Sequence, residues 1–329
     1  MSITAYSVGI IGAGAWGTAL AQVIAQTHGQ CLIWARSPAV ASAINQTHEN
    51  PLYLPDVPLS PTIAATGSLA EMAQCGILLI AVPAQFLRAI LSKLPATSAA
   101  LILCAKGLEA GTRATMAEIA AEICPDNPVA ILSGPTFAHE VAAGKPTAIT
   151  LACADEARGA RLALAIAAPH FRPYWTSDVI GAQIGGAVKN VLAIGCGVVS
   201  GAGLGQNAGA ALIARGFAEM QRFGMAKGAR RETLAGLSGL GDLVLTCSSE
   251  SSRNFSFGRG LGEGKSAQSL LSNRRTVAEG AGTAPVLLAS AQFLGVDMPI
   301  TTTVCGLLNG AMNTQQAIQA LLSRPLRAE

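Results

Sequence analysis

The stretch that decides the fold runs Tyr6-Ser7-Val8-Gly9-Ile10-Ile11-Gly12-Ala13-Gly14-Ala15-Trp16-Gly17-Thr18-Ala19-Leu20-Ala21-Gln22-Val23-Ile24. Its first residues predict a buried strand and its last residues a helix, with the pattern G-x-G-x-x-G at the turn between them. In such a turn Gly12 makes the tight bend, Gly14 lets the backbone approach a pyrophosphate, and Gly17 allows the helix to pack on the strand. A glycine-rich turn without a ligand is the alternative. The position between a strand and a helix favours a dinucleotide site.

An arginine directly follows the second predicted strand. Residues 31–35 predict a short buried strand, and Arg36 follows it where folds that prefer NAD carry Asp or Glu for the adenosine ribose. No acidic residue occurs between Gly12 and Glu49. Because a guanidinium binds a 2′-phosphate, Arg36 favours NADP over NAD. The alternative is an exposed arginine that merely ends the strand.

Further strands alternate with helices through the first half of the chain. Ligands of open α/β sheets bind at the carboxyl ends of the strands, so the polar and glycine-rich residues there are candidates for ligand contact. Lys106 directly follows one such strand, and we expect it to meet substrate or cofactor. A solvated lysine in a turn is the alternative. The expected strands cover residues 76–82, 100–105, 129–133, 147–152 and 171–175.

The composition changes near residue 178, where strand-like runs almost vanish and helical patterns rich in Ala, Leu and Gly take over. We therefore expect an α/β Rossmann-type N-terminal domain of residues 1–177 and an all-α C-terminal domain of residues 178–329. The expected helices of the second domain, beyond the one that leaves the boundary, cover residues 208–223, 231–234, 266–271, 283–294, 301–309 and 314–323.

One lysine lies inside the apolar, helix-like segment Gly185-Gly186-Ala187-Val188-Lys189-Asn190-Val191-Leu192-Ala193-Ile194-Gly195. An ammonium among such side chains loses part of its hydration and gives up a proton more readily. Asn190 is placed to orient a ligand oxygen. Gly185 and Gly186 leave room for another backbone or a ligand. Because this helix runs directly out of the domain boundary, we expect Lys189 next to the cleft between the domains. A core lysine that reaches water along its aliphatic stem is the alternative.

A second polar concentration runs from Gly239 to Asn254 and is rich in hydroxyl groups. This stretch predicts a phosphate-binding site. Arg253 would bind the phosphate bidentately, and Asn254 would donate a hydrogen bond from its side chain. Asp242 lies in an otherwise apolar part of this stretch, where it can hold Lys189 or a substrate hydroxyl. A mobile loop without a ligand is the alternative.

Composition limits the classes of function. The net charge of +3 is too small to imply nucleic acid but fits a cationic pocket for a small anionic ligand. The eight cysteines are at least 20 residues apart and form no Cys-x-x-Cys, which fits no zinc site. Apolar neighbours at most of them indicate reduced, buried thiols. No apolar run reaches the length of a membrane span without a charge or glycines, and the first residues carry no export signal. We expect a cytoplasmic protein without a membrane span.

Six motifs carry a resemblance to a known family. They are Gly12-Ala13-Gly14-Ala15-Trp16-Gly17, Ala105-Lys106-Gly107-Leu108-Glu109, Ser133-Gly134-Pro135-Thr136-Phe137-Ala138, Gly186-Ala187-Val188-Lys189-Asn190, residues 207–220, and Gly241-Asp242 through Asn254. In this order and spacing, the sequence resembles bacterial NAD(P)-dependent sn-glycerol-3-phosphate dehydrogenase over essentially its whole length.

The resemblance implies a second domain like the helical domain of 6-phosphogluconate dehydrogenase. It also implies reversible reduction of dihydroxyacetone phosphate to sn-glycerol 3-phosphate, which supplies phospholipid synthesis. NADP is the expected cofactor, NAD is an option, no metal is required, and a homodimer is compatible. Lys189 would be the proton donor and acceptor. The implied substrate residues are Lys106, Gly134, Thr136, Lys189, Asn190, Asp242, Thr246, Ser252, Arg253 and Asn254. The implied cofactor residues are Gly12, Gly14, Ala15, Trp16, Gly17, Arg36, Lys106, Ala138, Arg253, Val277 and Glu279.

Two other functions remain open at the level of sequence. A β-hydroxyacid-type NADP dehydrogenase would share both domains and the lysine, but it needs a carboxylate site where this chain offers Ser252-Arg253-Asn254. A regulator that binds NADP without catalysis would share the nucleotide domain and oxidise no NADPH.

Overall fold

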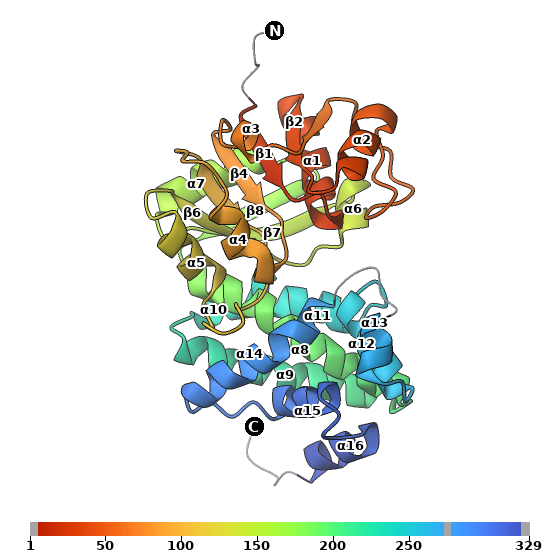
Figure 1. Ribbon diagram of the computed structural model, residues 1–329. Coiled ribbons are helices and arrows are strands. Elements are labelled where there is room, and N and C mark those ends of the chain that lie inside the picture. Colours follow the sequence, from red (N-terminus) through yellow and green to blue (C-terminus); the bar gives the residue numbers. More distant parts are fainter. Residues whose placement is uncertain (1–5, 273–277, 324–329) are drawn as a thin grey trace. The chain divides into compact units, whose positions relative to one another are not determined.

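The computed structural model describes residues 6–272 and 278–323. It divides into two compact units (Figure 1). The first unit holds the chain up to Lys106 together with Ala114–Ala182, and the second holds Gly107–Arg113 and the chain from Gln183 onward. The domain boundary expected between residues 177 and 178 stays a prediction.

The first unit is built around an eight-stranded sheet with the order β3-β2-β1-β4-β5-β6-β7-β8. Neighbouring strands are parallel except for β6 and β7. The order reverses between β1 and β4, which is the point where open α/β sheets bind their ligands. This topology confirms the expected Rossmann-type domain. The strands are β1 (Val8–Ile11), β2 (Cys31–Trp34), β3 (Ile63–Thr66), β4 (Ile77–Ile80), β5 (Ala100–Leu103), β6 (Val129–Ser133), β7 (Thr147–Ala152) and β8 (Phe171–Thr176).

The strands send alternate side chains into two apolar cores. In β4, Leu79 enters one core, while Leu78 and Ile80 enter the other. Helices α1, α2, α6 and α7 contribute to the core of Leu79, and α3, α4 and α5 to the opposite one. Because both faces are covered, the central strands are apolar throughout. The helices of this unit are α1 (Ala15–His28), α2 (Pro38–Thr47), α3 (Leu69–Met72), the 3-10 helix η1 (Ala84–Phe86), α4 (Leu87–Leu91), α5 (Met116–Ile123), α6 (Ala138–Ala142) and α7 (Glu156–Ile166).

The second unit is helical, as expected, and has α8 (Val179–Gly201) at its core. By length and composition α8 is able to cross a membrane, but 89% of its most apolar 18-residue window is buried inside the protein. A helix that is apolar on all sides is also what a protein core requires. The remaining helices are α9 (Gly205–Ala226), α10 (Arg231–Ala235), the π-helix η2 (Leu237–Gly241), α11 (Asp242–Cys247), α12 (Arg253–Gly262), α13 (Ala267–Ser272), α14 (Glu279–Phe293), α15 (Pro299–Leu308) and α16 (Thr314–Leu322).

Helix α12 was not predicted because three glycines interrupt its sequence. In the structure those glycines have a packing role. A Cβ on Gly258 would lie 2.0 Å from the carbonyl oxygen of Ile194 in α8, and one on Gly262 would lie 2.4 Å from that of Val198. Small residues here let the backbones of α8 and α12 touch, so tertiary packing overrides a weak local helix propensity.

Candidate active site

The glycine-rich turn joins β1 to α1 in the first unit. Gly12 has a φ of +116°, and a Cβ there would lie 2.7 Å from the carbonyl oxygen of Ala81. A Cβ on Gly17 would lie 1.8 Å from the carbonyl oxygen of Gly12. Both positions therefore require glycine, Gly12 also because side-chain-bearing residues rarely adopt a positive φ. The turn has the tight form that the pattern predicted.

Gly14 differs from these two because the space around it is open. A Cβ on Gly14 would meet nothing within 4 Å of the described chain. Gly14 is the N-cap of the 14-residue helix α1, and no described side chain caps this helix end. Backbone N–H groups and the helix dipole at such a terminus favour an anion. The residues present therefore fit the pyrophosphate of a dinucleotide.

Other predicted residues of the first unit lie at or beyond the carboxyl ends of strands. Lys106 follows β5, and its Nζ donates a hydrogen bond to the carbonyl oxygen of Gly134 at 3.1 Å. Thr136 Oγ1 donates to the same oxygen at 3.3 Å. The sheet thus brings three predicted substrate residues together. Arg36 lies exposed beyond β2, Ala138 begins α6, and Ala15 and Trp16 lie in the first turn of α1.

Lys189 lies on α8 with its ammonium buried in the second unit. The side chain is 8% exposed, and Nζ donates to Asp242 Oδ1 at 2.7 Å and to Thr246 Oγ1 at 2.8 Å. Thr246 Oγ1 in turn donates to Asp242 Oδ1 at 3.2 Å. Asp242 is fully buried. Its carboxylate therefore stabilises the positive charge of Lys189 in place of bulk water. A lysine that merely reached water along its stem would have an exposed ammonium.

A backbone contact one turn earlier explains why these side chains meet. A Cβ on Gly185 would lie 2.2 Å from the carbonyl oxygen of Ser238 in η2, so α8 and η2 touch through their main chains. Lys189 lies four residues after Gly185, and Asp242 four residues after Ser238. Side chains one helical turn beyond a contact lie on the same face as that contact. The expectation that Gly185 admits another backbone is confirmed.

A second buried cluster joins three helices. Asn254 of α12 donates from Nδ2 to Asn190 Oδ1 of α8 at 3.0 Å. Its Oδ1 accepts a hydrogen bond from the backbone N–H of Gly280 in α14 at 2.9 Å. Gly280 was not predicted, and its role is visible only in the fold, since a Cβ there would lie 2.4 Å from the carbonyl oxygen of Asn190. The amide of Asn254 therefore fixes helices, and its contact with substrate stays a prediction.

Two helix starts carry the remaining predicted residues. Ser252 is the buried N-cap of α12, and its Oγ accepts a hydrogen bond from the N–H of Phe255 at 3.2 Å. Arg253 is exposed at the first position of α12, and Glu279 is half-buried at the first position of α14. The predicted cofactor residue Val277 lies outside the described residues.

Cys247 directly follows Thr246, and its thiol is buried. Burial raises the pKa of the Cys247 thiol well above its usual range, and the neighbouring Cys196 raises it further. Since the thiolate is the reactive form, this thiol is chemically quiet. Six of the eight cysteines are buried, which confirms the expected burial of most of them. Among the described residues, no group of three or more His, Cys, Asp or Glu side chains is placed to hold a metal ion.

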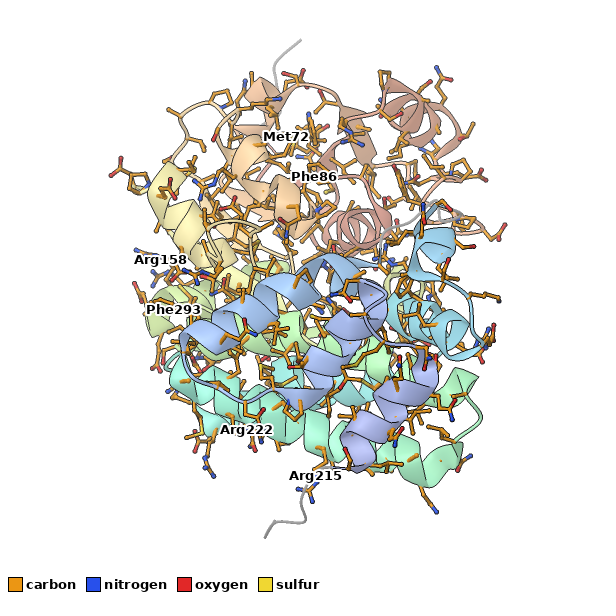
Figure 2. All side chains as sticks on the ribbon, turned by 60° about the horizontal axis from the view of Figure 1, so that its bottom comes forward. Met72, Phe86, Arg158, Arg215, Arg222 and Phe293 are labelled. Atoms are coloured by element: carbon orange, nitrogen blue, oxygen red, sulfur yellow. The ribbon has the colours of Figure 1, made fainter. Side chains whose placement is uncertain are left out.

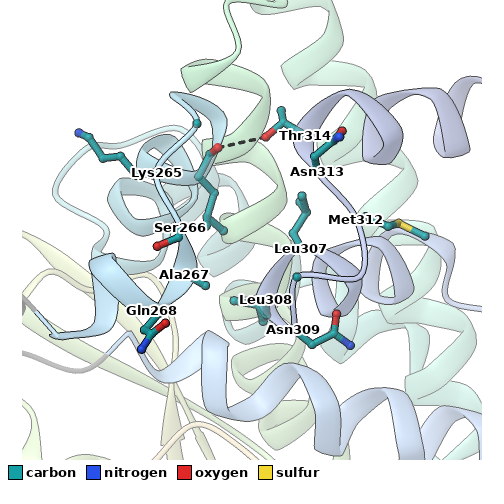
Figure 3. Close-up of a pocket in the computed structure, with 13 residues that line it drawn as sticks. Lys265, Ser266, Ala267, Gln268, Leu307, Leu308, Asn309, Met312, Asn313 and Thr314 are labelled. Carbon is teal, nitrogen blue, oxygen red and sulfur yellow. Dashed lines mark hydrogen bonds between the residues drawn. The ribbon is translucent and has the colours of Figure 1, made fainter.

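A separate cavity of about 400 Å³ lies in the second unit, near the connections before α13 and before α16 (Figure 3). Lys265, Gln268 and Asn309 line it, and Thr314 Oγ1 donates to the carbonyl oxygen of Leu261 at 3.1 Å on one side of it. Among residues 6–272 and 278–323, no predicted substrate or cofactor residue lines this cavity. It is distinct from the buried cluster around Lys189.

The fold and the site together define a class of protein. A Rossmann-type sheet with an open glycine-rich turn, followed by a helical unit with a buried lysine paired to a carboxylate, is typical of dinucleotide-dependent oxidoreductases. Residues 7–159 match the family model described as NAD-dependent glycerol-3-phosphate dehydrogenase N-terminus. Residues 178–319 match the one described as NAD-dependent glycerol-3-phosphate dehydrogenase C-terminus. The chain belongs to the NAD-dependent glycerol-3-phosphate dehydrogenase family.

Individual relatives agree with the family. The chain is 59% identical to glycerol-3-phosphate dehydrogenase [NAD(P)+] 1 of Sphingopyxis alaskensis over 99% of both chains. It is 52% identical to glycerol-3-phosphate dehydrogenase [NAD(P)+] of Caulobacter vibrioides over 99% of this chain and 100% of that protein. Among solved structures, glycerol-3-phosphate dehydrogenase from Coxiella burnetii superposes with a TM-score of 0.92 at 37% identity, covering 96% of this chain and 98% of that chain.

Proposed function

We propose that this chain reduces dihydroxyacetone phosphate to sn-glycerol 3-phosphate, and catalyses the reverse reaction, with NADPH or NADH. The observation that carries the proposal is the buried contact of Lys189 with Asp242 and Thr246, in a chain of this family. The substrate is a small anionic ketone, which suits the cationic side chains at the predicted site.

Lys189 is the proposed proton donor for the carbonyl oxygen. When hydride reaches the C2 carbon, negative charge develops on that oxygen, and a nearby ammonium stabilises and then protonates it. An ammonium carries three N–H bonds. Two of them are directed by Asp242 and Thr246, so the direction of the third is set as well. In the reverse reaction the neutral amine takes the proton from the C2 hydroxyl.

The proposed phosphate contacts are made by Arg253, together with a hydroxyl at Ser252 and the amide of Asn254. A guanidinium binds phosphate bidentately, and the first turn of α12 adds backbone N–H groups of its own. Binding energy from the phosphate orients the carbonyl, although the phosphate does not react. Lys106 and Thr136, which share the carbonyl oxygen of Gly134, are proposed as further substrate contacts.

The chain uses a nicotinamide dinucleotide, and the residues proposed to hold it are those of the turn at Gly12, Gly14 and Gly17. When bound in its reduced form, the cofactor supplies the hydride. Arg36 is exposed beyond β2, and we propose that it favours NADP through a 2′-phosphate. Ala138, Val277 and Glu279 remain proposed cofactor contacts.

The activity is tested by following oxidation of NADPH and of NADH with dihydroxyacetone phosphate and with small keto acids in parallel. We expect turnover with dihydroxyacetone phosphate. Turnover with keto acids alone would indicate a β-hydroxyacid-type dehydrogenase, and oxidation with no ketone would indicate a binding protein without catalysis.

The role of Lys189 needs a variant that does not leave a charge unpaired. Lys189→Met alone strands the buried carboxylate of Asp242, and breaking a buried pair in this way costs about 3–5 kcal/mol of stability. The double variant Lys189→Met with Asp242→Asn removes both charges. We expect it to fold, to bind NADPH, and to lose on the order of 10² to 10⁴ in kcat. Asp242→Asn alone keeps the ammonium but leaves it without its carboxylate, so it shows how much of the loss comes from Asp242. A double variant with the kcat of the unsubstituted chain would show that Lys189 is not the proton donor.

We also propose a cytoplasmic homodimer that supplies glycerol phosphate for phospholipid synthesis. The eight free thiols support a reducing compartment. Light scattering on the purified chain tests the dimer, and a monomeric mass would contradict it.

A further inference from the structure

Asn50 is a buried amide beside the glycine-rich turn, in the loop that follows α2. It is 0% exposed. Its Nδ2 donates to the carbonyl oxygen of Ala13 at 2.9 Å and to Thr18 Oγ1 at 2.8 Å. Its Oδ1 accepts a hydrogen bond from the backbone N–H of Tyr53 at 3.3 Å. Both ends of the amide are therefore satisfied, which a buried polar group requires.

The contact with Ala13 orients a whole peptide unit. A trans peptide is planar, so its C=O and its N–H point in opposite directions. No cis peptide bond occurs among the described residues. Because the carbonyl of Ala13 is held toward Asn50, the N–H of Gly14 is held in the direction away from Asn50. That N–H belongs to the open N-terminus of α1, where the turn fits a pyrophosphate.

The contact with Thr18 fixes the same turn at a second point. Thr18 is fully buried in α1, and its backbone N–H donates to the carbonyl oxygen of Gly14 at 2.9 Å. Asn50 thus bridges the residue before Gly14 and the residue one helical turn after it. If the Ala13–Gly14 peptide turned over, a buried amide donor would lose its partner, which opposes that rotation.

We propose that Asn50 is a positioning residue for the dinucleotide, which holds the Ala13–Gly14 peptide so that the Gly14 N–H is presented to the pyrophosphate. The inference rests on the proposed pyrophosphate site at residues 12–17. Every nicotinamide dinucleotide carries the pyrophosphate, so Asn50 should contribute equally to the binding of NADPH and of NADH. This separates it from Arg36, which is assigned to the 2′-phosphate.

The test is the dissociation constant of NADPH and of NADH, measured by titrating the full chain and following the fluorescence of the bound nucleotide. Asn50→Ala is expected to raise both constants by a similar factor of about ten, because one hydrogen bond to a charged group is weakened. Since Asn50 is not assigned to the substrate, kcat at saturating cofactor should change much less than the KM for cofactor. Asn50→Ser keeps one hydroxyl donor and serves if Asn50→Ala does not fold; its expected effect is smaller but again equal for the two cofactors.

Asn127→Ala is the matched control in the same unit. Asn127 also donates to two backbone carbonyl groups, those of Thr97 at 2.8 Å and Ala99 at 2.9 Å, but it does not contact the glycine-rich turn. We expect this variant to lower the melting temperature without changing either dissociation constant. A change of dissociation constant that matched that of Asn50→Ala would reduce Asn50 to a purely structural role.

Gly14→Val tests the proposed pyrophosphate site independently of Asn50. Gly14 has a φ of −74°, and a Cβ there would meet nothing within 4 Å of the described chain, so a valine adds its side chain in the space assigned to pyrophosphate. The melting temperature of the variant checks that it folds. If Gly14→Val weakens the binding of both cofactors while a folded Asn50 variant does not, the positioning role of Asn50 is wrong, and the proposed pyrophosphate site is retained. If Gly14→Val binds both cofactors normally, the proposed site itself fails. An Asn50 variant that weakens NADPH alone also overturns the inference.

Discussion

Arg253 owes its proposed role to its place at the first position of α12, where an exposed guanidinium and the helix N-terminus favour the same anion. Arg253→Ala should raise the KM for dihydroxyacetone phosphate about tenfold to a hundredfold, since a hydrogen bond to a charged group contributes about 1.5–3 kcal/mol. The KM for NADPH should change less. Steady-state kinetics with each substrate varied in turn provides the measurement.

Arg259 offers the control for Arg253 on the same helix. It pairs with Glu250 and, at 3.6 Å, with Glu263, and no substrate contact is proposed for it. Arg259→Ala should leave both KM values close to those of the unsubstituted chain. If the two arginine variants behave alike, the phosphate site lies elsewhere.

Arg36 decides cofactor choice if its guanidinium meets a 2′-phosphate. Arg36→Asp should weaken NADPH binding by about 2 kcal/mol or more, because a charge-assisted contact becomes a repulsion. NADH lacks that phosphate and should be affected much less, so the ratio of the two dissociation constants is the measurement. Equal losses for both cofactors would contradict the assignment.

Residues in local patterns were predictable and residues joined only by the fold were not. Lys189 and Asp242 each stand out as single charges in apolar stretches, and the sequence indicated that one can hold the other. Asn50 lies far along the chain from Ala13, in a loop whose sequence predicts only turns. No local pattern signals such a contact, so the structure alone reveals it.

At the scale of elements, the contact of α8 with η2 places the Lys189 cluster. A Cβ on Gly185 would lie 2.2 Å from the carbonyl oxygen of Ser238, closer than real Cβ atoms approach. Gly185→Ala should therefore separate the helices, destabilise the chain by about 2 kcal/mol or more, and lower kcat by displacing Asp242. The melting temperature and kcat are the measurements.

Gly209→Ala in α9 is the control for Gly185→Ala. A Cβ on Gly209 would meet nothing within 4 Å of the described chain, so only the helix propensity changes. Alanine should be neutral or stabilise the helix by up to about 1 kcal/mol, with kcat unchanged. A Gly185→Ala variant that behaved the same way would show that the contact does not position Asp242.

Two helix starts in the second unit, those of α14 and α15, depend on side chains from other helices, and this limits prediction from sequence. The sequence placed the start of α14 at residue 283, because Gly280, Gly282 and Pro285 argue against an earlier one. The structure begins α14 at Glu279, where Asn254 accepts a hydrogen bond from the N–H of Gly280. The acceptor comes from another helix, so local propensity does not predict it.

At the scale of the whole molecule, the second unit includes residues from the loop that follows β5. Leu108 is 1% exposed in the core of this unit, and the guanidinium of Arg113 lies 4.6 Å from the ring centroid of Phe293. Figure 2 shows Phe293 at the end of α14. Composition marks a change near residue 178, but it gives no signal for a short loop that joins a distant core.

The second unit also contains a buried carboxylate without a proposed role in catalysis. Glu219 of α9 is 1% exposed, and its oxygens accept hydrogen bonds from the N–H groups of Ile300 and Thr301 at the start of α15. Burial raises the pKa of Glu219 to about 7, although these N–H groups, the Thr301 hydroxyl and the charge of Arg222 act in the opposite direction. Arg222 lies at the surface of the same helix (Figure 2).

This raised pKa makes the stability of the protein depend on pH. Between the usual pKa of Glu, 4.5, and about 7, the folded chain holds a proton on Glu219 that the unfolded chain releases, so stability falls as pH rises through this window. The loss amounts to roughly 3 kcal/mol as an upper figure. Glu219→Gln should remove this loss of stability. The difference in unfolding free energy between the two proteins, measured in urea from pH 5 to 8, should therefore change with pH.

Glu263→Gln is the control, because Lys265 lowers the pKa of Glu263 and confines the effect of Glu263 on stability to more acidic solution. A difference for Glu219→Gln that stays constant from pH 5 to 8 would show that Glu219 is ionised throughout.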